Sequence, residues 1–390
     1  MGAQKYGEFQ LTISWISIFS SFTMFGLPGV VSKHINSNKI NNYSILFSGI
    51  IIKICLSIFS LLILSSLVYF QYLNVNNEYF LILMLIPIFN SYLIINTFLE
   101  TINKSKVFFK ISLFVVLIGL TTRLVIYYFK LSIDYFVYIY AIEIFLLFLF
   151  NTGFLIKQFK DLKPKFDKSL FKKSSYFGFA SIAFIIVGNI DQLVLSYFFD
   201  DNIVGKYSLA YRIILLIYGL SSPISNGLFE RLKEHNKDSI LWSSLFSVHL
   251  FLSLILILLY FLIGKRIVIT IVSFEYQETI KYLDSLIFIL PFLLLTIPIG
   301  KWLLINNKGK LFFKRASISI FINVVTNIIL IKFLGVYAVI IGTLFTYIWL
   351  SVVCLFIESE LNVLKNIFII SVKNIFKIKT NLKLLYVRNK

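Results

Sequence analysis

Acidic residues are scarce in this chain: 18 of its 390 residues are Asp or Glu, against 37 Lys and Arg. Cysteine is almost absent, since Cys55 and Cys354 are the only two and neither has a partner at metal-ligand spacing. There is no phosphate-binding glycine loop, and the three histidines, His34, His235 and His249, are scattered. These absences argue against a disulfide framework, a zinc site, a bound cofactor and an enzymatic constellation.

Apolar residues dominate what is present. Hydrophobic residues make up 58% of the chain, and the mean hydropathy is +0.88, whereas a soluble domain is about half apolar. A water-soluble core is therefore excluded. The net charge of +19 does not indicate nucleic acid as a partner, because the basic residues cluster between long apolar runs, as they do in membrane proteins.

Eleven apolar runs are long enough to cross about 30 Å of hydrocarbon as helix, which takes about 20 residues each. They are too long, and too uniformly apolar, to be strands of a β-barrel. We therefore predict an all-α, polytopic membrane protein with spans at residues 9–31, 43–70, 79–99, 107–129, 135–156, 176–199, 204–229, 239–263, 285–305, 311–332 and 335–357.

Basic residues are shared unequally between alternate loops. One set of loops, together with the C-terminal tail, holds 23 Lys and Arg, and the other set holds 5. The positive-inside rule places the richer set in the cytoplasm. The C-terminus is therefore predicted to be cytoplasmic and the N-terminus external.

Internal similarity predicts a repeat. The string Asn-Lys-Ser-Lys-Val-Phe-Phe-Lys at 103–110 recurs as Asn-Lys-Gly-Lys-Leu-Phe-Phe-Lys at 307–314, and Pro87 precedes Pro291 by the same 204 residues. Tyr-Gly-Glu-Phe-Gln-Leu, which begins at Tyr6, likewise recurs as Val-Gly-Lys-Tyr-Ser-Leu. Matched spans run in the same direction, so the copies form a parallel repeat about an axis along the membrane normal.

The repeat predicts two helical bundles, of five and six spans, around a central cavity. The second copy has one more span at its start than the first, so the first helix of the repeated unit is predicted to be missing here. The predicted domains are an N-terminal bundle at 1–156, a basic cytoplasmic linker at 157–175, a C-terminal bundle at 176–357 and a basic cytoplasmic tail at 358–390. The linker is expected to lie near anionic lipid.

With these features the chain resembles the polysaccharide flippases of the multidrug/oligosaccharidyl-lipid/polysaccharide exporter superfamily, the O-antigen transporters. The resemblance rests on four stretches in order. They are a Gly-x-x-x-Tyr-Gly-x-Phe opening and Phe-Gly-Leu-Pro within 2–29, an Asp followed by Val-Gly-x-Tyr-x-x-Ala within 191–210, Phe-Glu-Tyr at 274–276, and Asn-x-x-x-Asn with Leu-Gly-Val-Tyr within 323–342.

The resemblance implies a flippase in the bacterial cytoplasmic membrane. It implies that an undecaprenyl-diphosphate-linked oligosaccharide moves by alternating access to the outer leaflet, for O-antigen or capsule synthesis, with a proton or sodium gradient as the energy source. A drug or cation antiporter of the same superfamily is the main alternative. A membrane glycosyltransferase or polymerase of the same pathway is a weaker one, because no external loop is long enough for a catalytic domain.

Ionisable residues within the spans are the candidate functional residues, because each costs a few kcal/mol at mid-membrane unless it faces a cavity or a partner. Arg123 and Glu143 lie at equal depth on either side of one external turn, and Asp191 and Arg212 do so at another. Either these are structural ion pairs, or the arginines bind substrate phosphate while Glu143 and Asp191 tune them or couple transport to an ion. A third alternative is that the arginines extend to the outer membrane interface.

Lys53 and His249 occupy equivalent spans of the two copies, in the inner half of the membrane. Lys53 is a candidate substrate ligand as a point charge, or its ammonium reaches the cytoplasmic headgroups. His249 is a candidate ion-coupling residue, or a hydrogen-bonded group inside the bundle.

Overall fold

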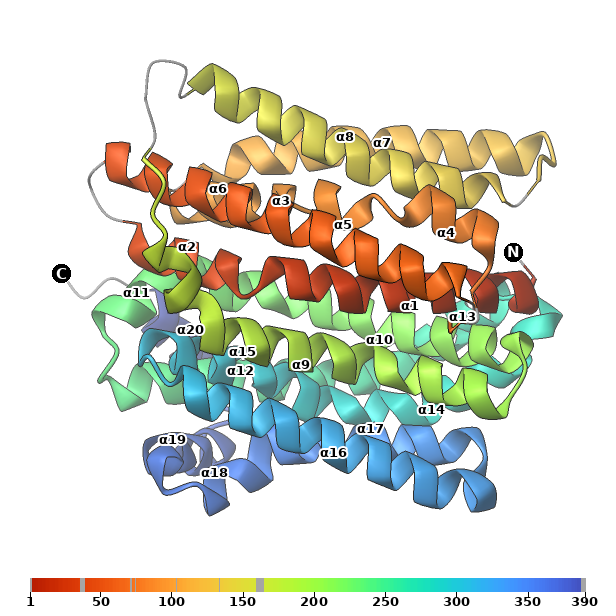
Figure 1. The fold of residues 1–390 in the computed structure, drawn as a ribbon. Helices are drawn as coiled ribbons and strands as arrows, with labels where there is room; N and C mark the ends of the chain where they lie inside the picture. Colours follow the sequence, from red (N-terminus) through yellow and green to blue (C-terminus); the bar gives the residue numbers. More distant parts are fainter. Residues whose placement is uncertain are drawn as a thin grey trace. The chain divides into compact units, whose positions relative to one another are not determined.

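The computed structural model describes residues 2–35, 39–70, 72–73, 75–102, 104–132, 134–158 and 165–386 (Figure 1). The regular secondary structure of these residues is helical throughout, without a strand among them. The predicted all-α fold is confirmed.

Within the described residues, eleven helical stretches are long and apolar enough to cross a membrane. Each overlaps one of the predicted runs, so the predicted number of spans is confirmed. They are Ala3–Ser32, Asn42–Tyr69, Asn77–Thr101, Ser105–Tyr128, Tyr135–Gln158, Gly178–Phe198, Asp201–Gly227, Ser239–Ile271, Phe274–Ile305, Gly309–Leu334 and Val336–Ile357.

The chain forms two compact units. Unit 1 is built from Glu8–Asn189, and unit 2 from Gly2–Gly7 together with Ile190–Lys390. Helices α1 (Ala3–Met24) and α9 (Ser169–Phe198) each contribute to both. The predicted bundles, linker and tail, and the division of spans into five and six, stay predictions; linker residues 159–164 and tail residues 387–390 lie outside the described part of the chain.

Unit 1 is built around broken helices. Helix α1 ends where Phe25 and Gly26 adopt positive φ angles of 41° and 67°, and a conformation of this kind suits glycine. The apolar core of unit 1 contains Leu27, Leu46 and Phe98, all at most 1% exposed. After α1 come α2 (Leu27–His34), α3 (Lys39–Tyr69), α4 (Asn77–Leu83), α5 (Ile86–Phe89), α6 (Tyr92–Thr101), α7 (Ser105–Tyr128) and α8 (Tyr135–Gln158).

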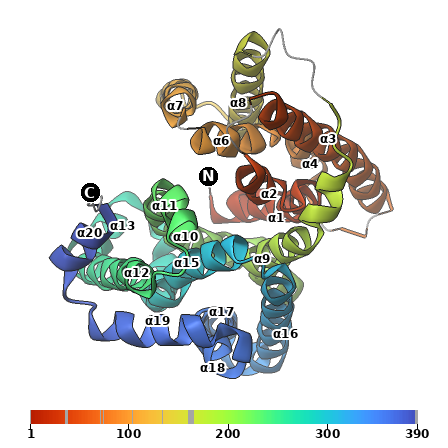
Figure 2. The same cartoon turned by 90° about the vertical axis from the view of Figure 1, so that its left-hand side faces the viewer.

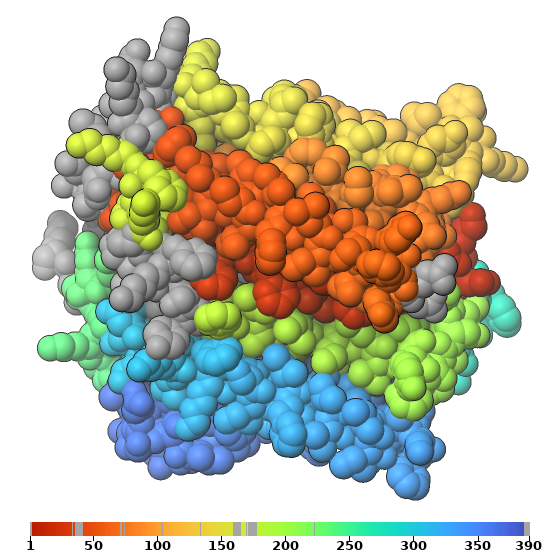
Figure 3. Space-filling view, viewed as in Figure 1, coloured from red at the N-terminus to blue at the C-terminus, as the bar shows by residue number. Residues whose placement is uncertain are grey.

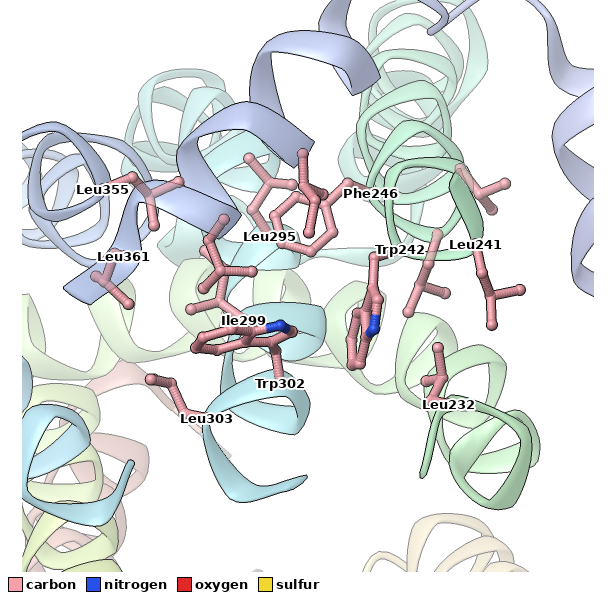
Figure 4. Packing of buried hydrophobic residues seen from close by; sticks show 14 of the residues in the cluster. Leu232, Leu241, Trp242, Phe246, Leu295, Ile299, Trp302, Leu303, Leu355 and Leu361 are labelled. Atoms are coloured by element: carbon pink, nitrogen blue, oxygen red, sulfur yellow. The ribbon is translucent and has the colours of Figure 1, made fainter. Parts of the chain in front are cut away.

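Unit 2 has an apolar core of its own, which contains tryptophan, phenylalanine and leucine side chains. Figure 4 shows Trp242 and Phe246 of α12 facing Leu295, Ile299 and Trp302 of α15. Its helices are α10 (Asp201–Gly227), α11 (Phe229–Glu234), α12 (Ser239–Leu259), η1 (Tyr260–Gly264), α13 (Lys265–Ile271), η2 (Phe274–Tyr276), α14 (Gln277–Leu286), η3 (Ile287–Ile289), α15 (Leu290–Ile305), α16 (Gly309–Leu334), α17 (Val336–Ile348), η4 (Trp349–Val353), α18 (Cys354–Ile357), η5 (Ser359–Leu361), α19 (Asn362–Lys373) and α20 (Ile378–Tyr386).

Helix boundaries repeat as the sequence does. Helix α5 begins at Ile86 and α15 at Leu290, which is 204 residues later. Helix α7 begins at Ser105 and α16 at Gly309, again 204 residues later. The internal repeat therefore extends from sequence to local structure, and a proline stands second in both α5 and α15, where a missing N–H is tolerated.

Two equivalent glycines bring helix backbones together in unit 2. A Cβ atom on Gly7 would lie 1.9 Å from the carbonyl oxygen of Asp201, and one on Gly205 would lie 2.0 Å from that of Ala3. These glycines occupy the same place in the repeated string that contains Tyr6. Only glycine permits so close an approach of the first turns of α1 and α10.

The outward faces of the spans are apolar, as contact with lipid requires. On α16 the side chain of Phe321 is 68% exposed and that of Phe333 is 81% exposed. Figure 3 shows α16, in blue, lying along the surface of unit 2. In water such surfaces would promote association.

Candidate functional site

Unit 2 buries the carboxylate of Asp191. Its residue is 1% exposed, and it lies on the part of α9 that belongs to unit 2. Long apolar segments of α9, α10, α16 and α17 form the helices around it. A carboxylate here must find partners within the protein, because neither lipid nor a packed core solvates it.

Four neutral side chains donate hydrogen bonds to Asp191. Its Oδ2 atom accepts from the hydroxyl of Tyr207 at 2.7 Å and from that of Thr343. Its Oδ1 atom accepts from the amide nitrogen of Asn323 at 3.1 Å and, at 3.3 Å, from that of Asn327. None of these partners carries a positive charge, so the negative charge of an ionised Asp191 is uncompensated by its neighbours.

Oxygen atoms gather around the same carboxylate. Asn327 Nδ2 also donates to Asn323 Oδ1 at 3.0 Å, and the hydroxyl of Thr343 lies 2.9 Å from the carbonyl oxygen of Val339. The Oδ1 atom of Asn327 is buried and has no hydrogen-bond partner. Carboxylate, amide, hydroxyl and carbonyl oxygens are the ligands that hard cations prefer. A half-turn of either asparagine amide would present further oxygen to a bound cation.

Glycine at position 342 makes room for this cluster. A Cβ atom on Gly342 would lie 2.0 Å from Asn327 Oδ1. Helices α16 and α17 can therefore pack closely enough for Asn323, Asn327 and Thr343 to reach one carboxylate. Two asparagines four residues apart lie on the same face of α16.

A tyrosine pair extends the network. The rings of Tyr207 and Tyr211 are stacked, with centroids 6.1 Å apart. The hydroxyl of Tyr211 in turn lies 3.1 Å from that of Tyr347. All three tyrosines are at most 5% exposed, so the hydrogen-bonded cluster continues from Asp191 into the interior of unit 2.

The prediction that Asp191 pairs with Arg212 is wrong. Equal depth on neighbouring helices does not determine the direction of a side chain, and Asp191 points to α16 and α17 instead. Arg212 lies beside Tyr6, close enough for their side chains to hydrogen-bond. The charge of Arg212 therefore does not neutralise that of Asp191.

Arg123 and Glu143 do form the ion pair that their equal depth suggested. Both guanidinium nitrogens bind the carboxylate, at 2.6 and 2.7 Å, in the bidentate geometry that makes such pairs strong. The Arg123 side chain is 29% exposed and that of Glu143 is 17% exposed. Gly119 leaves the space for Glu143, since a Cβ atom there would lie 1.5 Å from Oε1.

Lys53 is a buried charge of unit 1. It is 0% exposed, and its ammonium donates to the carbonyl oxygen of Pro87 and lies 3.5 Å from the hydroxyl of Thr23. The Ser57 hydroxyl also donates to that carbonyl at 3.0 Å, while the amide of Ser91 bonds to Ile88 instead, where α5 gives way to α6. Lys53 therefore binds the end of a broken helix, where a positive charge is favourable, and its ammonium does not extend to the unit surface.

His249 is hydrogen-bonded on both ring nitrogens. Nδ1 lies 2.9 Å from the carbonyl oxygen of Leu245, and Nε2 lies 3.3 Å from the hydroxyl of Ser225. This pattern suits a neutral ring that donates from Nδ1 and accepts at Nε2. Its geometry accounts for His249 as a packing group, and its proposed part in ion coupling stays a prediction.

One buried charge was not singled out by the sequence analysis. Arg315 of α16 is 1% exposed; it donates from Nε to the Cys354 sulfur at 3.2 Å and from Nη2 to the Leu350 carbonyl. Its Nη1 atom is buried without a hydrogen-bond partner. Its place four residues inside the predicted span was the available signal. The asparagine and threonine partners of Asp191 were likewise unassigned, although the Asn-x-x-x-Asn string was visible.

Residues 1–229 match the family model described as "Polysaccharide biosynthesis protein", which covers more than half of the chain. The chain belongs to the polysaccharide biosynthesis protein family. No curated protein sequence matches it. The family confirms the resemblance to polysaccharide flippases that the sequence motifs suggested.

Solved structures show the fold of this family member. It is similar to the "Lipid II flippase MurJ, inward closed conformation", at 18% identity and a TM-score of 0.64 over 99% of this chain and 89% of that one. An inward-facing "multidrug resistance MATE family transporter of the MOP superfamily" gives 16% identity and a TM-score of 0.60, over 100% of this chain and 93% of that one.

A third match is a MOP superfamily transporter from Pyrococcus furiosus, at 14% identity and a TM-score of 0.60, which covers 95% of this chain and 86% of that one. The family member therefore has the fold of the MOP superfamily and is a multi-pass membrane protein. Because flippases and multidrug transporters share this fold, the fold leaves the transported molecule open.

Proposed function

We propose that this protein is a flippase that moves an undecaprenyl-diphosphate-linked oligosaccharide across the bacterial cytoplasmic membrane, from the cytoplasmic to the outer leaflet. The family match supports a role in polysaccharide synthesis. Sugars on a lipid diphosphate cannot cross hydrocarbon unaided, because the head group is charged and polar. The protein is proposed to expose a polar path alternately to the two sides, without catalysing a reaction.

The observation that carries the energetic part of this proposal is the uncompensated carboxylate of Asp191. Burial of an isolated charge is costly, so the carboxylate is most stable when it holds a proton or a monovalent cation. Its neutral donors and the unpartnered Asn327 oxygen fit both occupants. We assign the ion-coupling step to Asp191, with H⁺ or Na⁺ as the coupled ion.

The cationic groups are the proposed ligands of the diphosphate. Arg212, which lies beside Tyr6, and Lys53, which holds only neutral oxygens, are the stronger candidates. The charge of Arg123 is already matched by Glu143 in a bidentate pair. We therefore rank Arg123 below the other two, and assign Glu143 to holding Arg123 rather than to ion coupling.

Drug or cation export is the second candidate function, and the likeness to multidrug transporters favours it to the extent that fold can. A cationic drug calls for acidic groups that lack basic partners. Asp191 is such a group, but neutral side chains enclose it at 1% exposure, which suits a small ion better than a drug.

The test is transport by purified protein in liposomes. We expect a fluorescent polyprenyl-diphosphate oligosaccharide to change leaflets faster than in empty liposomes, and a Na⁺ or H⁺ gradient to accelerate it. Ethidium should not be transported under the same gradients. Ethidium transport without movement of the glycolipid would contradict the flippase proposal and support drug export.

A cell assay complements this experiment. Surface polysaccharide is scored in a flippase-deficient host that expresses wild type, Arg212→Ala or Arg123→Ala. We expect Arg212→Ala to lower surface polysaccharide more than Arg123→Ala, with equal protein in the membrane. Equal polysaccharide from wild type and both variants would remove the arginines from substrate binding.

A further inference from the structure

The C-terminal segment forms two short helices that pack on unit 2. We call α19 (Asn362–Lys373) and α20 (Ile378–Tyr386) the tail helices. Leu364, Ile367 and Leu385 are at most 1% exposed and belong to the same apolar core as Trp242. The segment therefore does not extend freely from the last span. It is part of the folded unit.

Hydrogen bonds fix the tail helices in place. The Arg231 guanidinium donates to the carbonyl oxygens of Leu385 at 2.7 Å and Leu384 at 2.9 Å, in the last turn of α20. The hydroxyl of Ser247 on α12 lies 2.9 Å from the carbonyl oxygen of Ser371 on α19. The outward faces of the tail helices consequently have a definite direction.

Apolar side chains remain exposed on those outward faces. Phe376, between the two helices, is 77% exposed; Val363 is 54% exposed and Val372 is 48% exposed. Leu382 and Leu384 of α20 are 40% and 39% exposed. Each helix thus has apolar side chains on the face that packs on unit 2, and further apolar side chains among the polar residues of its exposed surface. Water alone is an unfavourable environment for so many exposed apolar groups on two short helices.

Basic residues accompany these apolar groups, and acidic residues do not. The described tail contains five lysines, at positions 365, 373, 377, 379 and 383, and no acidic residue follows Glu360 in the sequence. The two acidic residues that immediately precede the tail helices in the sequence are occupied, since Glu360 pairs with Lys308 at 2.6 Å and Glu358 with Lys314 at 2.8 Å. The tail surface therefore carries an excess of positive charge.

The direction of α19 suits a membrane surface. In Figure 1 α19 is seen nearly end-on while α16 is seen along its length, and Figure 2, turned by 90°, shows α19 along its length. Helix α19 therefore runs across the direction of the α16 span. It lies at the end of unit 2 that holds α11, and Ser247 of α12 holds it there through the carbonyl oxygen of Ser371. Amphipathic helices with lysine beside apolar residues lie in this way at bilayer interfaces.

We propose that the tail helices bind the headgroups of anionic phospholipids in the adjoining leaflet. The lysines of α20 and of the turn before it contact lipid phosphate, while Phe376 and its apolar neighbours enter the boundary of the acyl chains. An acidic protein would match the lysines but leave these apolar side chains in water. Each lysine near an anionic surface is expected to raise the affinity roughly fivefold.

A site-directed fluorophore tests the position of the tail. The full-length protein carries Cys55→Ser, which removes its exposed cysteine, and Phe376→Cys labelled with bimane; Cys354 is buried. Nanodiscs contain phosphatidylcholine alone or a mixture with phosphatidylglycerol. We expect the mixture to shift the emission to the blue and to permit quenching by doxyl-labelled lipid. A label that stays in water in both lipids overturns the proposal, as does one shielded from both water and doxyl lipid.

Matched charge changes test the lysines. One variant carries Lys373→Gln, Lys377→Gln, Lys379→Gln and Lys383→Gln. The control carries the same change, Lys→Gln, at four exposed positions of unit 1: Lys104, Lys106, Lys110 and Lys157. We expect the tail variant to weaken phosphatidylglycerol binding at least tenfold and to abolish lipid quenching at position 376. The control should keep that quenching.

Equal loss of quenching in the two variants overturns the proposal. Lipid binding would then depend on the net charge of the whole protein and not on the lysines of the tail helices. All substituted tail lysines are exposed to solvent, so we expect the variant to fold. An unchanged melting temperature in neutral detergent verifies this. The outcome is independent of which molecule the protein transports.

Discussion

Among the described residues, unit 1 buries the positive charge of Lys53, whereas unit 2 buries the negative charge of Asp191 as well as the positive charge of Arg315. Unit 1 buries the ammonium of Lys53 against the carbonyl oxygen of Pro87 at the end of a broken helix. Unit 2 buries the carboxylate of Asp191 among side chains of intact helical segments. Since the two copies share helix boundaries 204 residues apart, the difference shows that one repeated framework can be adapted to hold either sign of charge.

The spans predicted to be equivalent hold different buried groups. His249 lies on the span that matches that of Lys53, and it bonds to the carbonyl oxygen of Leu245 in its own helix. A neutral imidazole that donates to a carbonyl oxygen of its own helix does not need an interrupted neighbouring helix to supply an acceptor. Asp191, in contrast, accepts hydrogen bonds from side chains of three other helices, α10, α16 and α17. We therefore propose separate tasks for the two buried groups, anion binding for Lys53 and ion coupling for Asp191.

The largest expected effect comes from Asp191→Asn. The variant keeps the size of the side chain and removes the negative charge that attracts the coupled ion, so gradient-driven transport should fall about a hundredfold, or about 2.7 kcal/mol in barrier height. Asp284→Asn is the control, because Asp284 pairs with Lys265 and is partly exposed. Proteoliposome transport with and without a gradient is the measurement. Full gradient dependence in Asp191→Asn would remove Asp191 from ion coupling.

Gly205→Ala should produce the largest loss of stability. Its new methyl group would meet backbone, at 2.0 Å from the Ala3 carbonyl oxygen, so α1 and α10 must move apart at a cost of about 1–3 kcal/mol. Gly219→Ala on the same helix has nothing within 4 Å of its new atom and should be neutral or stabilising by up to about 1 kcal/mol. Thermal unfolding in detergent compares them, and equal melting temperatures would contradict the close approach.

Lys53→Met tests the role of the buried lysine in unit 1. It removes the buried positive charge and keeps the length of the side chain, so affinity for a polyprenyl diphosphate should fall about tenfold, equivalent to about 1.4 kcal/mol. The dependence of the remaining transport on the ion gradient should be unchanged. Lys106→Met, at an exposed position, is the control. A loss of gradient dependence with normal lipid affinity would contradict the role assigned to Lys53.

The smallest effect is expected at Glu360, outside the spans. Its hydrogen bond from Lys308, and then the charge of that lysine, lower the pKa of this carboxyl. A lowered pKa in the folded state stabilises the fold above the ordinary pKa of glutamate, and this contribution disappears as the pH falls through the lowered value. Glu360→Gln should therefore melt slightly below wild type at neutral pH and coincide with it in acid. A difference that persists in acid would exclude the ion pair as its cause.

The sequence predicted the helical architecture well because a span must be long and apolar wherever it lies in the chain. It also predicted the Arg123–Glu143 pair from depth alone. The same argument failed for Asp191, since depth does not determine on which face of a helix a partner lies. Asn323, Asn327 and Thr343 converge on Asp191 only through tertiary packing, which Gly342 permits. No local pattern carries that information.

The contact between Gly7 and Gly205 also bears on how a duplicated protein evolves. Each residue is the copy of the other, and each faces the backbone of the helix that holds its copy. If two separate but identical chains met in this way, one mutation would alter both sides of the contact at once. Joined in a single gene, the two sides can change one at a time, so a larger residue on one helix can be accommodated by later change on the other.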